Sequence, residues 1–132
     1  MTSAVGRLGT GLSPVGRLGT VVLDCAEPSA LAEFWSVVLG KPVVEKTDEW
    51  WELAPLDGGV AVAFQRVGKH RPPDSRRPQQ LHLDVTVDDL DASERVVLGL
   101  GATAQGDTRP GGGKPWRTYL NPAGHPFCLC TC

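Results

Sequence analysis

The sequence has little that would suit nucleic acid, a membrane or export. Its formal net charge is −2, so no basic surface for nucleic acid or anionic lipid is indicated. No hydrophobic run approaches the roughly 18 residues that a membrane-spanning helix needs. The N-terminal MTSAVGRLGTGLSPVG lacks the apolar segment of a secretory signal. We therefore expect a cytoplasmic protein that binds neither nucleic acid nor membrane.

Several catalytic motifs are missing as well. Residues 111–113 are glycines, but no Lys-Ser/Thr pair and no helix start follows them, so they form no phosphate-binding loop. There is no nucleophile elbow, no Ser-His-Asp ordering and no dinucleotide fingerprint. Single residues separate Cys128, Cys130 and Cys132, whereas structural zinc sites space paired cysteines by two or more residues. We expect reduced thiols at 130 and 132, and either a small buried residue or a functional thiol at 128.

The length of 132 residues predicts one domain with a core of its own. VGRLGT occurs twice, at residues 5–10 and 15–20, but so short a repeat builds no solenoid. We interpret residues 1–17 as a tail and 18–132 as a single domain.

Hydrophobic periodicity predicts the same order of elements, β-α-β-β-β, in both halves of this domain. Unit one spans residues 18–67, a polar linker spans 68–79, and unit two spans 80–132. The expected helices run from Pro28 to a Gly40 cap and from an Asp88 or Asp89 cap to Gly99 or Gly101. The expected strands cover 20–25, 42–47, 50–54, 60–67, 81–87, 101–107, 116–120 and 126–132.

The segment LHLDVTV alternates with a period of two, which is typical of a strand with two different faces. One face carries Leu81, Leu83, Val85 and Val87, and the other carries His82, Asp84 and Thr86. The apolar face can pack on a helix. The polar face meets water or lines a site.

In their order and spacing, a set of short motifs resembles the vicinal oxygen chelate superfamily, which includes glyoxalase I, bleomycin-resistance proteins and extradiol dioxygenases. The resemblance covers about residues 18 to 130 and is nearest to the small glyoxalase-like domains common in actinobacteria. The motifs are Leu31-Ala32-Glu33-Phe34-Trp35 with Leu39-Gly40, Leu81-His82-Leu83-Asp84 with Val87-Asp88-Asp89-Leu90, Leu100-Gly101-Ala102, and Asn121-Pro122-Ala123-Gly124-His125.

The resemblance implies an α+β fold in which two tandem β-α-β-β-β units form curved sheets around a cavity, with helices on the outer face. His82, Asp84 and Thr86 would then line the cavity. Metal-dependent members take their ligands from the first and last strand of each unit. Carried over, these positions are Thr20, Gln65, His82 and Cys128.

This ligand set departs from the family pattern, because Thr20 is a poor metal ligand and Cys128 stands where Glu is usual. His82, Gln65 and Cys128 remain as candidate ligands for one divalent metal, Zn, Ni or Fe. The alternatives are a cavity-wall histidine, a polar strand end and a small buried thiol.

Further residues complete the predicted ligand site. Trp50 and Trp51 must face opposite sides of a strand, and we assign Trp51 to the site together with Trp116, since aromatic walls suit a planar or apolar ligand. Asp84 is the candidate general base. A direct contact between His82 and Asp84 is not expected, because residues i and i+2 lie nearly 7 Å apart along a strand. His125, in the late turn, is expected to bond backbone.

Two functions follow from the resemblance. The first is a bleomycin-resistance-like protein that binds a small aromatic or apolar molecule in the cavity without metal. The second is a metal-dependent lyase, isomerase or dioxygenase anchored on His82, in which the metal acts as Lewis acid. A metal-free enzyme that uses Asp84 or His82 in acid–base catalysis is a third alternative. A homodimer is implied in either case.

Overall fold

Two sheets of identical topology build the protein in the computed structural model, which describes residues 14–74, 81–109 and 115–131. The first comprises strands in the order β1-β4-β3-β2 and the second in the order β5-β8-β7-β6. In each sheet the first and last strands of the unit pair in parallel, and the other neighbours are antiparallel. The predicted α+β fold of two tandem units is confirmed. The elements are β1 (Thr20–Cys25), α2 (Pro28–Leu39), β2 (Val43–Lys46), β3 (Trp50–Leu53), β4 (Ala61–Arg66), β5 (Leu83–Thr86), α3 (Leu90–Gly99), β6 (Thr103–Arg109), β7 (Trp116–Leu120) and β8 (Pro126–Cys130).

Local sequence signals set the ends of both helices. Pro28 occupies the first turn of α2, where its fixed φ suits the helix and its missing N–H costs nothing. Gly40 closes α2 with φ 67°, a left-handed conformation that glycine adopts without strain. Asp89 caps α3 by accepting a hydrogen bond from the Ala92 N–H at 3.0 Å. These cap predictions are confirmed.

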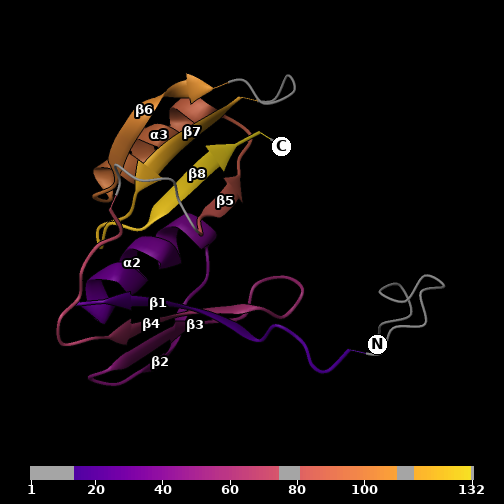
Figure 1. Cartoon of the computed structure of the whole chain (residues 1–132). Coiled ribbons are helices and arrows are strands. Elements are labelled where there is room, and N and C mark those ends of the chain that lie inside the picture. Colours follow the sequence, from indigo (N-terminus) through magenta and orange to yellow (C-terminus); the bar gives the residue numbers. More distant parts are fainter. Residues whose placement is uncertain (1–13, 75–80, 110–114, 132) are drawn as a thin grey trace.

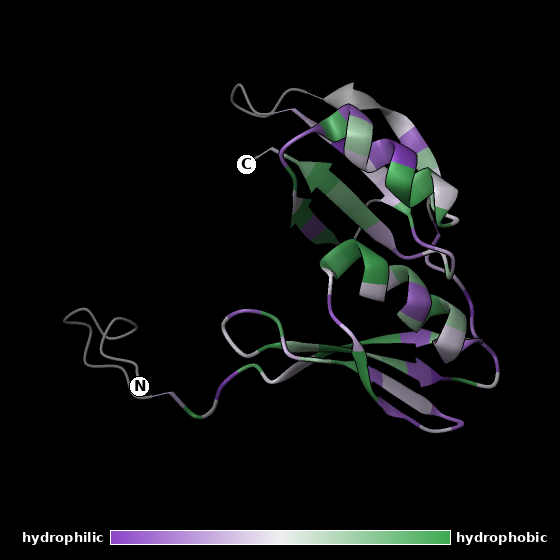
Figure 2. Ribbon diagram, turned by 180° about the vertical axis from the view of Figure 1, so that it is seen from behind, coloured by the Kyte–Doolittle hydropathy of each residue, from purple (hydrophilic) through white to green (hydrophobic). Residues whose placement is uncertain are grey.

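The core joins the two units. Helix α2 packs on β3 and β4 of its own sheet, and its Phe34 and Trp35 also contact Phe127 on β8 of the other sheet. Figure 1 shows α2 lying between the two sheets. Hydrophobic residues are concentrated in α2 and β8, whereas polar and apolar residues alternate in α3 (Figure 2). One hydrophobic cluster therefore contains buried residues of both units.

Three predicted segments reach beyond the described residues. They are most of the tail at residues 1–17, the end of the linker at 75–80 and the glycine loop at 110–114. Within the described part, neither helix has the length and hydrophobicity that a membrane span requires.

Candidate functional site

Strand β5 has one covered face and one open face. Leu83, Val85 and Val87 pack against the core, as predicted from the alternation. Leu81 does not, because it precedes the strand and is 71% exposed, so the prediction that it packs on a helix is wrong. His82, Asp84 and Thr86 are exposed to solvent on the opposite face.

The open face brings three potential ligands together. Asp84 on β5 pairs in register with Cys128 on β8, so both side chains lie on the same face. His82 Nε2 lies 3.1 Å from Asp84 Oδ1, and the ligand atoms of His82, Asp84 and Cys128 all lie within 4.8 Å of one another. The expectation that His82 and Asp84 do not touch is wrong. His82 lies just before the regular strand, and two side chains of this length close the gap between their backbones.

Cys128 is the buried member of the group. It is a free thiol with 6% of its surface exposed. Burial raises the pKa of the Cys128 thiol, and the nearby Asp84 carboxylate raises it further, whereas the hydrogen bond with Thr118 lowers it. Thr118 Oγ1 lies 3.4 Å from the sulfur, on the neighbouring strand β7. Without a bound cation, the thiol is therefore protonated at neutral pH.

The group matches a transition-metal site in ligand type and approximate spacing. Zinc binds imidazole, carboxylate and thiolate at about 2.0–2.3 Å, which puts neighbouring ligand atoms roughly 3.3–3.8 Å apart in a tetrahedral site. The contact of 3.1 Å between His82 and Asp84 is already this close, and the limit of 4.8 Å for the whole group requires small side-chain shifts. His82 and Asp84 are exposed enough for such shifts. Three protein ligands would leave one position open to a substrate or water.

Gln65 and Thr20, the remaining metal positions carried over from the family, belong to the other sheet. Thr20 pairs with Ala61, and Gln65 pairs with Asp24 and Trp50. Figure 1 shows β4 and β5 on opposite sides of α2. The structure therefore groups Asp84, and not Gln65, with His82 and Cys128 within a single chain.

The tryptophans divide between the two faces. Trp51 pairs with Phe64 and packs against the core, with Lys46 Nζ 5.6 Å from its ring centre. Its expected position on the site face is wrong. Trp50 lies on the open face of the first sheet and donates Nε1–H to Glu52 at 3.0 Å. Trp116 pairs with Cys130 on the open face of the second sheet, two residues along β7 from Thr118.

Two features were missed or misjudged from sequence. Thr118, the hydrogen-bond partner of Cys128, carries no sequence signal beyond its alternation with Tyr119. Cys130 is disulfide-bonded, so its expected reduced state is wrong. Cys132 lies outside the described residues. His125 does bond backbone, as expected, through a contact with Asp24.

Comparison with known proteins identifies the family. A family model described as a glyoxalase-like domain matches residues 20–130. A sequence search of curated proteins finds no significant match. Among solved structures, the chain is similar to a glyoxalase/bleomycin resistance protein/dioxygenase family enzyme from Burkholderia phytofirmans PsJN, with a TM-score of 0.71, 16% identity, and coverage of 87% of this chain and 98% of that one.

Two further structures show the same fold. The fosfomycin resistance protein FosX from Mesorhizobium loti has a TM-score of 0.66 and 17% identity, over 91% of this chain and 94% of that one. TioX from Micromonospora sp. ML1 has a TM-score of 0.58 and 19% identity, over 87% and 98%. These likenesses concern the fold, whereas the family model covers most of the sequence. The chain belongs to the glyoxalase-like domain family, within the vicinal oxygen chelate superfamily.

Proposed function

We propose that this protein binds a small oxygen-bearing molecule at the open face of β5, β8 and β7, through a divalent metal held by His82, Asp84 and Cys128. The observation that carries this proposal is the convergence of an imidazole, a carboxylate and a thiol within 4.8 Å. The donor set of nitrogen, oxygen and sulfur favours Zn, Ni or Fe over Mg or Ca.

Each residue then has a distinct task. Cys128 is held by a buried strand and binds as thiolate, so metal binding must release its proton. Thr118 can keep its hydrogen bond to the sulfur and orient it. Asp84 would supply a carboxylate oxygen, and its contact of 3.1 Å with His82 places the imidazole within reach of the same ion. When bound, the metal supplies Lewis-acid polarisation of substrate oxygens, and Trp116 offers an aromatic surface beside them.

A second copy of the chain completes the site in this proposal. The open face of the first sheet presents Gln65, Thr20 and Val22, and these cannot reach His82 within one chain because α2 lies between the sheets. A partner's open face laid over β5 and β8 would enclose a cavity and bring Gln65 close to the position that the three ligands leave open. The exposure of Val22 is consistent with such a covered surface.

The second candidate function is metal-free ligand binding of the bleomycin-resistance kind. The position of Trp116 on the open face, two residues along β7 from Thr118, favours it, because an aromatic side chain beside a few polar groups suits a planar ligand. In that case His82, Asp84 and Thr118 would orient a planar ligand against Trp116 by hydrogen bonds alone.

Metal content of untagged protein, measured by elemental mass spectrometry, separates the two candidates. The first predicts near-stoichiometric Zn, Ni or Fe that is lost in His82→Ala and Cys128→Ser but kept in His70→Ala. Cobalt substitution should add a thiolate-to-metal charge-transfer band that Cys128→Ser lacks. Metal-free protein whose melting temperature ignores added Zn, Ni and Fe would refute the metal site. A screen of planar ligands by tryptophan quenching, with His82→Ala as control, would then test the second candidate.

A further inference from the structure

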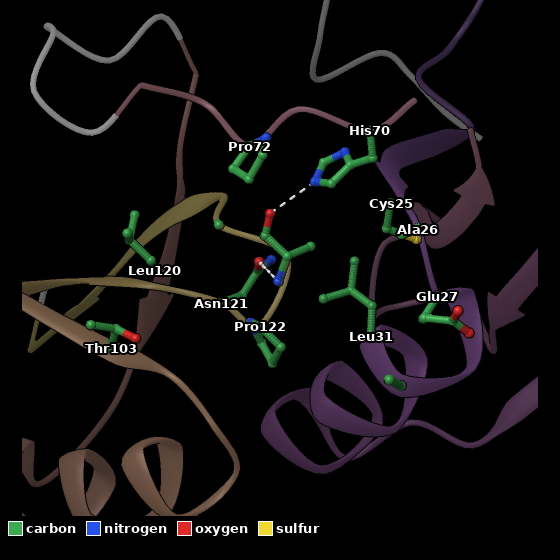
Figure 3. Close-up of a pocket in the computed structure, with 13 residues that line it drawn as sticks. Cys25, Ala26, Glu27, Leu31, His70, Pro72, Thr103, Leu120, Asn121 and Pro122 are labelled. Carbon is green, nitrogen blue, oxygen red and sulfur yellow. Dashed lines mark hydrogen bonds between the residues drawn. The ribbon is translucent and has the colours of Figure 1, made fainter. Parts of the chain in front are cut away.

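A pocket of about 360 Å³ lies at the junction of the two units, away from the His82 group (Figure 3). The first turn of α2 lines one side, and the turn of residues 121–124 between β7 and β8 lines another. His70 and Pro72, from the linker that joins the units, line a third side. We call linker residues 69–72 the strap.

The strap lies on the turn at two points. His70 Nε2 is 3.0 Å from the carbonyl oxygen of Ala123, and since that oxygen can only accept, His70 donates. Pro72 lies against Gly124, where φ is 91° and an added Cβ would come within 2.6 Å of Pro72 Cβ. The strap can therefore lie this close to the turn because position 124 has no side chain.

Hydrogen bonds of its own hold the turn in place. The N–H of Asn121 donates to the carbonyl of His125 at 2.9 Å, and the N–H of Gly124 donates to the carbonyl of Asn121 at 2.8 Å. Asn121 Oδ1 accepts from the N–H groups of Ala123 and His125, each at 3.0 Å. If strap and turn separate, the strap is therefore the part that moves.

The ring of His125 lies beside the strap, with its centre 5.7 Å from that of His70. Its Nδ1 is 3.2 Å from Asn121 Oδ1, and it bonds the backbone of Asp24 on β1. Both partners offer oxygen acceptors, so a protonated His125 keeps these contacts and strengthens them. When both imidazoles are charged they repel each other, and His70, on the exposed strap, is the one that can leave.

The seated strap opposes protonation of His125. Burial, and then His70, lower the pKa of His125, whereas the contact with Asp24 raises it. The ring is therefore neutral at neutral pH. Removing His70 from its side removes one of the two causes that lower this pKa.

Other ionisable groups surround the junction. Cys25 lines the pocket, and burial raises its pKa, so the thiol is uncharged. Glu27 lies 3.8 Å from Arg66 in an ion pair. The linker adds the charged residues Lys69, Arg71 and Asp74. Since histidine is the side chain that ordinarily changes charge between about pH 5 and 8, mild acid acts here on the two imidazoles.

We propose that the strap is a proton-sensitive clasp, seated on the turn at neutral pH and released in mild acid, when His70 and His125 both carry charge. Because the released form binds protons more tightly than the seated form, lowering the pH favours release. Release opens the pocket along the side that His70 and Pro72 line. None of these residues belongs to the His82 group, so the inference does not depend on the proposed function.

The test follows one contact in the full chain at about pH 7.5 and about pH 5.0. Because Pro72 lies against Gly124, NMR should show a nuclear Overhauser peak between Pro72 Hβ and Gly124 Hα at the higher pH. We expect this peak to fall at least about threefold at the lower pH, with a midpoint that coincides with titration of the His125 ring. Far-UV circular dichroism should stay unchanged over the same range.

Two matched variants remove one imidazole each. His70→Gln and His125→Gln keep a side chain that can form hydrogen bonds but cannot take up a proton, so both should retain the peak at about pH 5.0. His82→Ala, which removes the third histidine of the chain, should behave as the wild type does. A wild-type peak that persists in acid, an equal fall in His125→Gln, or a fall that occurs only as the ellipticity is lost would overturn the inference.

Discussion

Replacing Phe127 by alanine tests whether the two units are one cooperative structure. Phe127 is fully buried, and its ring centre lies 5.8 Å from Phe34, 5.2 Å from Trp35 and 5.5 Å from Tyr119. Truncating a buried phenylalanine costs about 3–5 kcal/mol, because transfer free energy is lost and a cavity remains. Aromatic pairs contribute about 0.5–1.5 kcal/mol beyond the effect of the buried area. We therefore expect the loss for Phe127→Ala to lie at the upper end of the range for a truncated phenylalanine. The free energy of unfolding of a typical domain is about 5–15 kcal/mol, so this single change removes a large part of it.

Urea unfolding followed by tryptophan fluorescence and far-UV circular dichroism measures the effect. We expect one transition for the wild type and the variant, with coincident midpoints by both probes, since α2 packs on both sheets. Phe127→Leu should lower the free energy of unfolding by less than Phe127→Ala does. Val96→Ala, at an exposed site on α3, should change it by no more than about 0.5 kcal/mol. A loss below about 1 kcal/mol for Phe127→Ala, or separated midpoints, would show that the core does not join the units.

Three shorter predictions concern single groups. Burial and a hydrogen bond to a carboxylate raise the pKa of Tyr119, the sole tyrosine, so ultraviolet absorbance should show no phenolate at about pH 11 until the protein unfolds. Gly124→Ala should lower the melting temperature more than Gly58→Ala does. Both glycines have positive φ, but only at position 124 would the new Cβ lie 2.6 Å from Pro72. Equal melting temperatures for the two variants would contradict this. Burial, and to a lesser extent His70, lower the pKa of His125 below its unfolded value of about 6.5. The folded state therefore binds fewer protons than the unfolded state, and stability is lost as pH falls below about 6.5. His125→Gln should flatten that slope in melting curves, and an unchanged slope would assign it to other groups.

The sequence predicted the elements well because their signals are local. Pro28, Gly40 and Asp89 act through the backbone of their own turn, so the helix ends did not depend on tertiary packing. The alternation in β5 likewise separated core residues from open-face residues. The prediction from this alternation failed at Leu81, because the pairing with β8 begins only at Leu83. The pattern of a single segment carries no information about where its pairing with another strand begins.

Residue pairs were harder to predict than elements. Alternation requires Trp50 and Trp51 to face opposite sides, but only the pairing of Trp51 with Phe64 decides which of them α2 covers. His70 and Asn121 come together from the linker and a late turn, about fifty positions apart, with no periodicity to connect them. The pocket between the units therefore had no sequence signal, even though the turn motif containing Asn121 was recognised.

The two strands that form the candidate metal site hold their ligands with different rigidity. Cys128 follows Phe127 on β8, an inner strand whose other face is the centre of the core. His82 and Asp84 come from β5, a four-residue strand at the edge of its sheet, and both are solvent-exposed. Core packing therefore fixes the sulfur, whereas the imidazole and the carboxylate can move toward a bound cation. Because Cys128 is part of the core as well as of the site, loss of metal in a Cys128 variant is evidence for ligation only when the metal-free variant and the metal-free wild type have the same unfolding free energy.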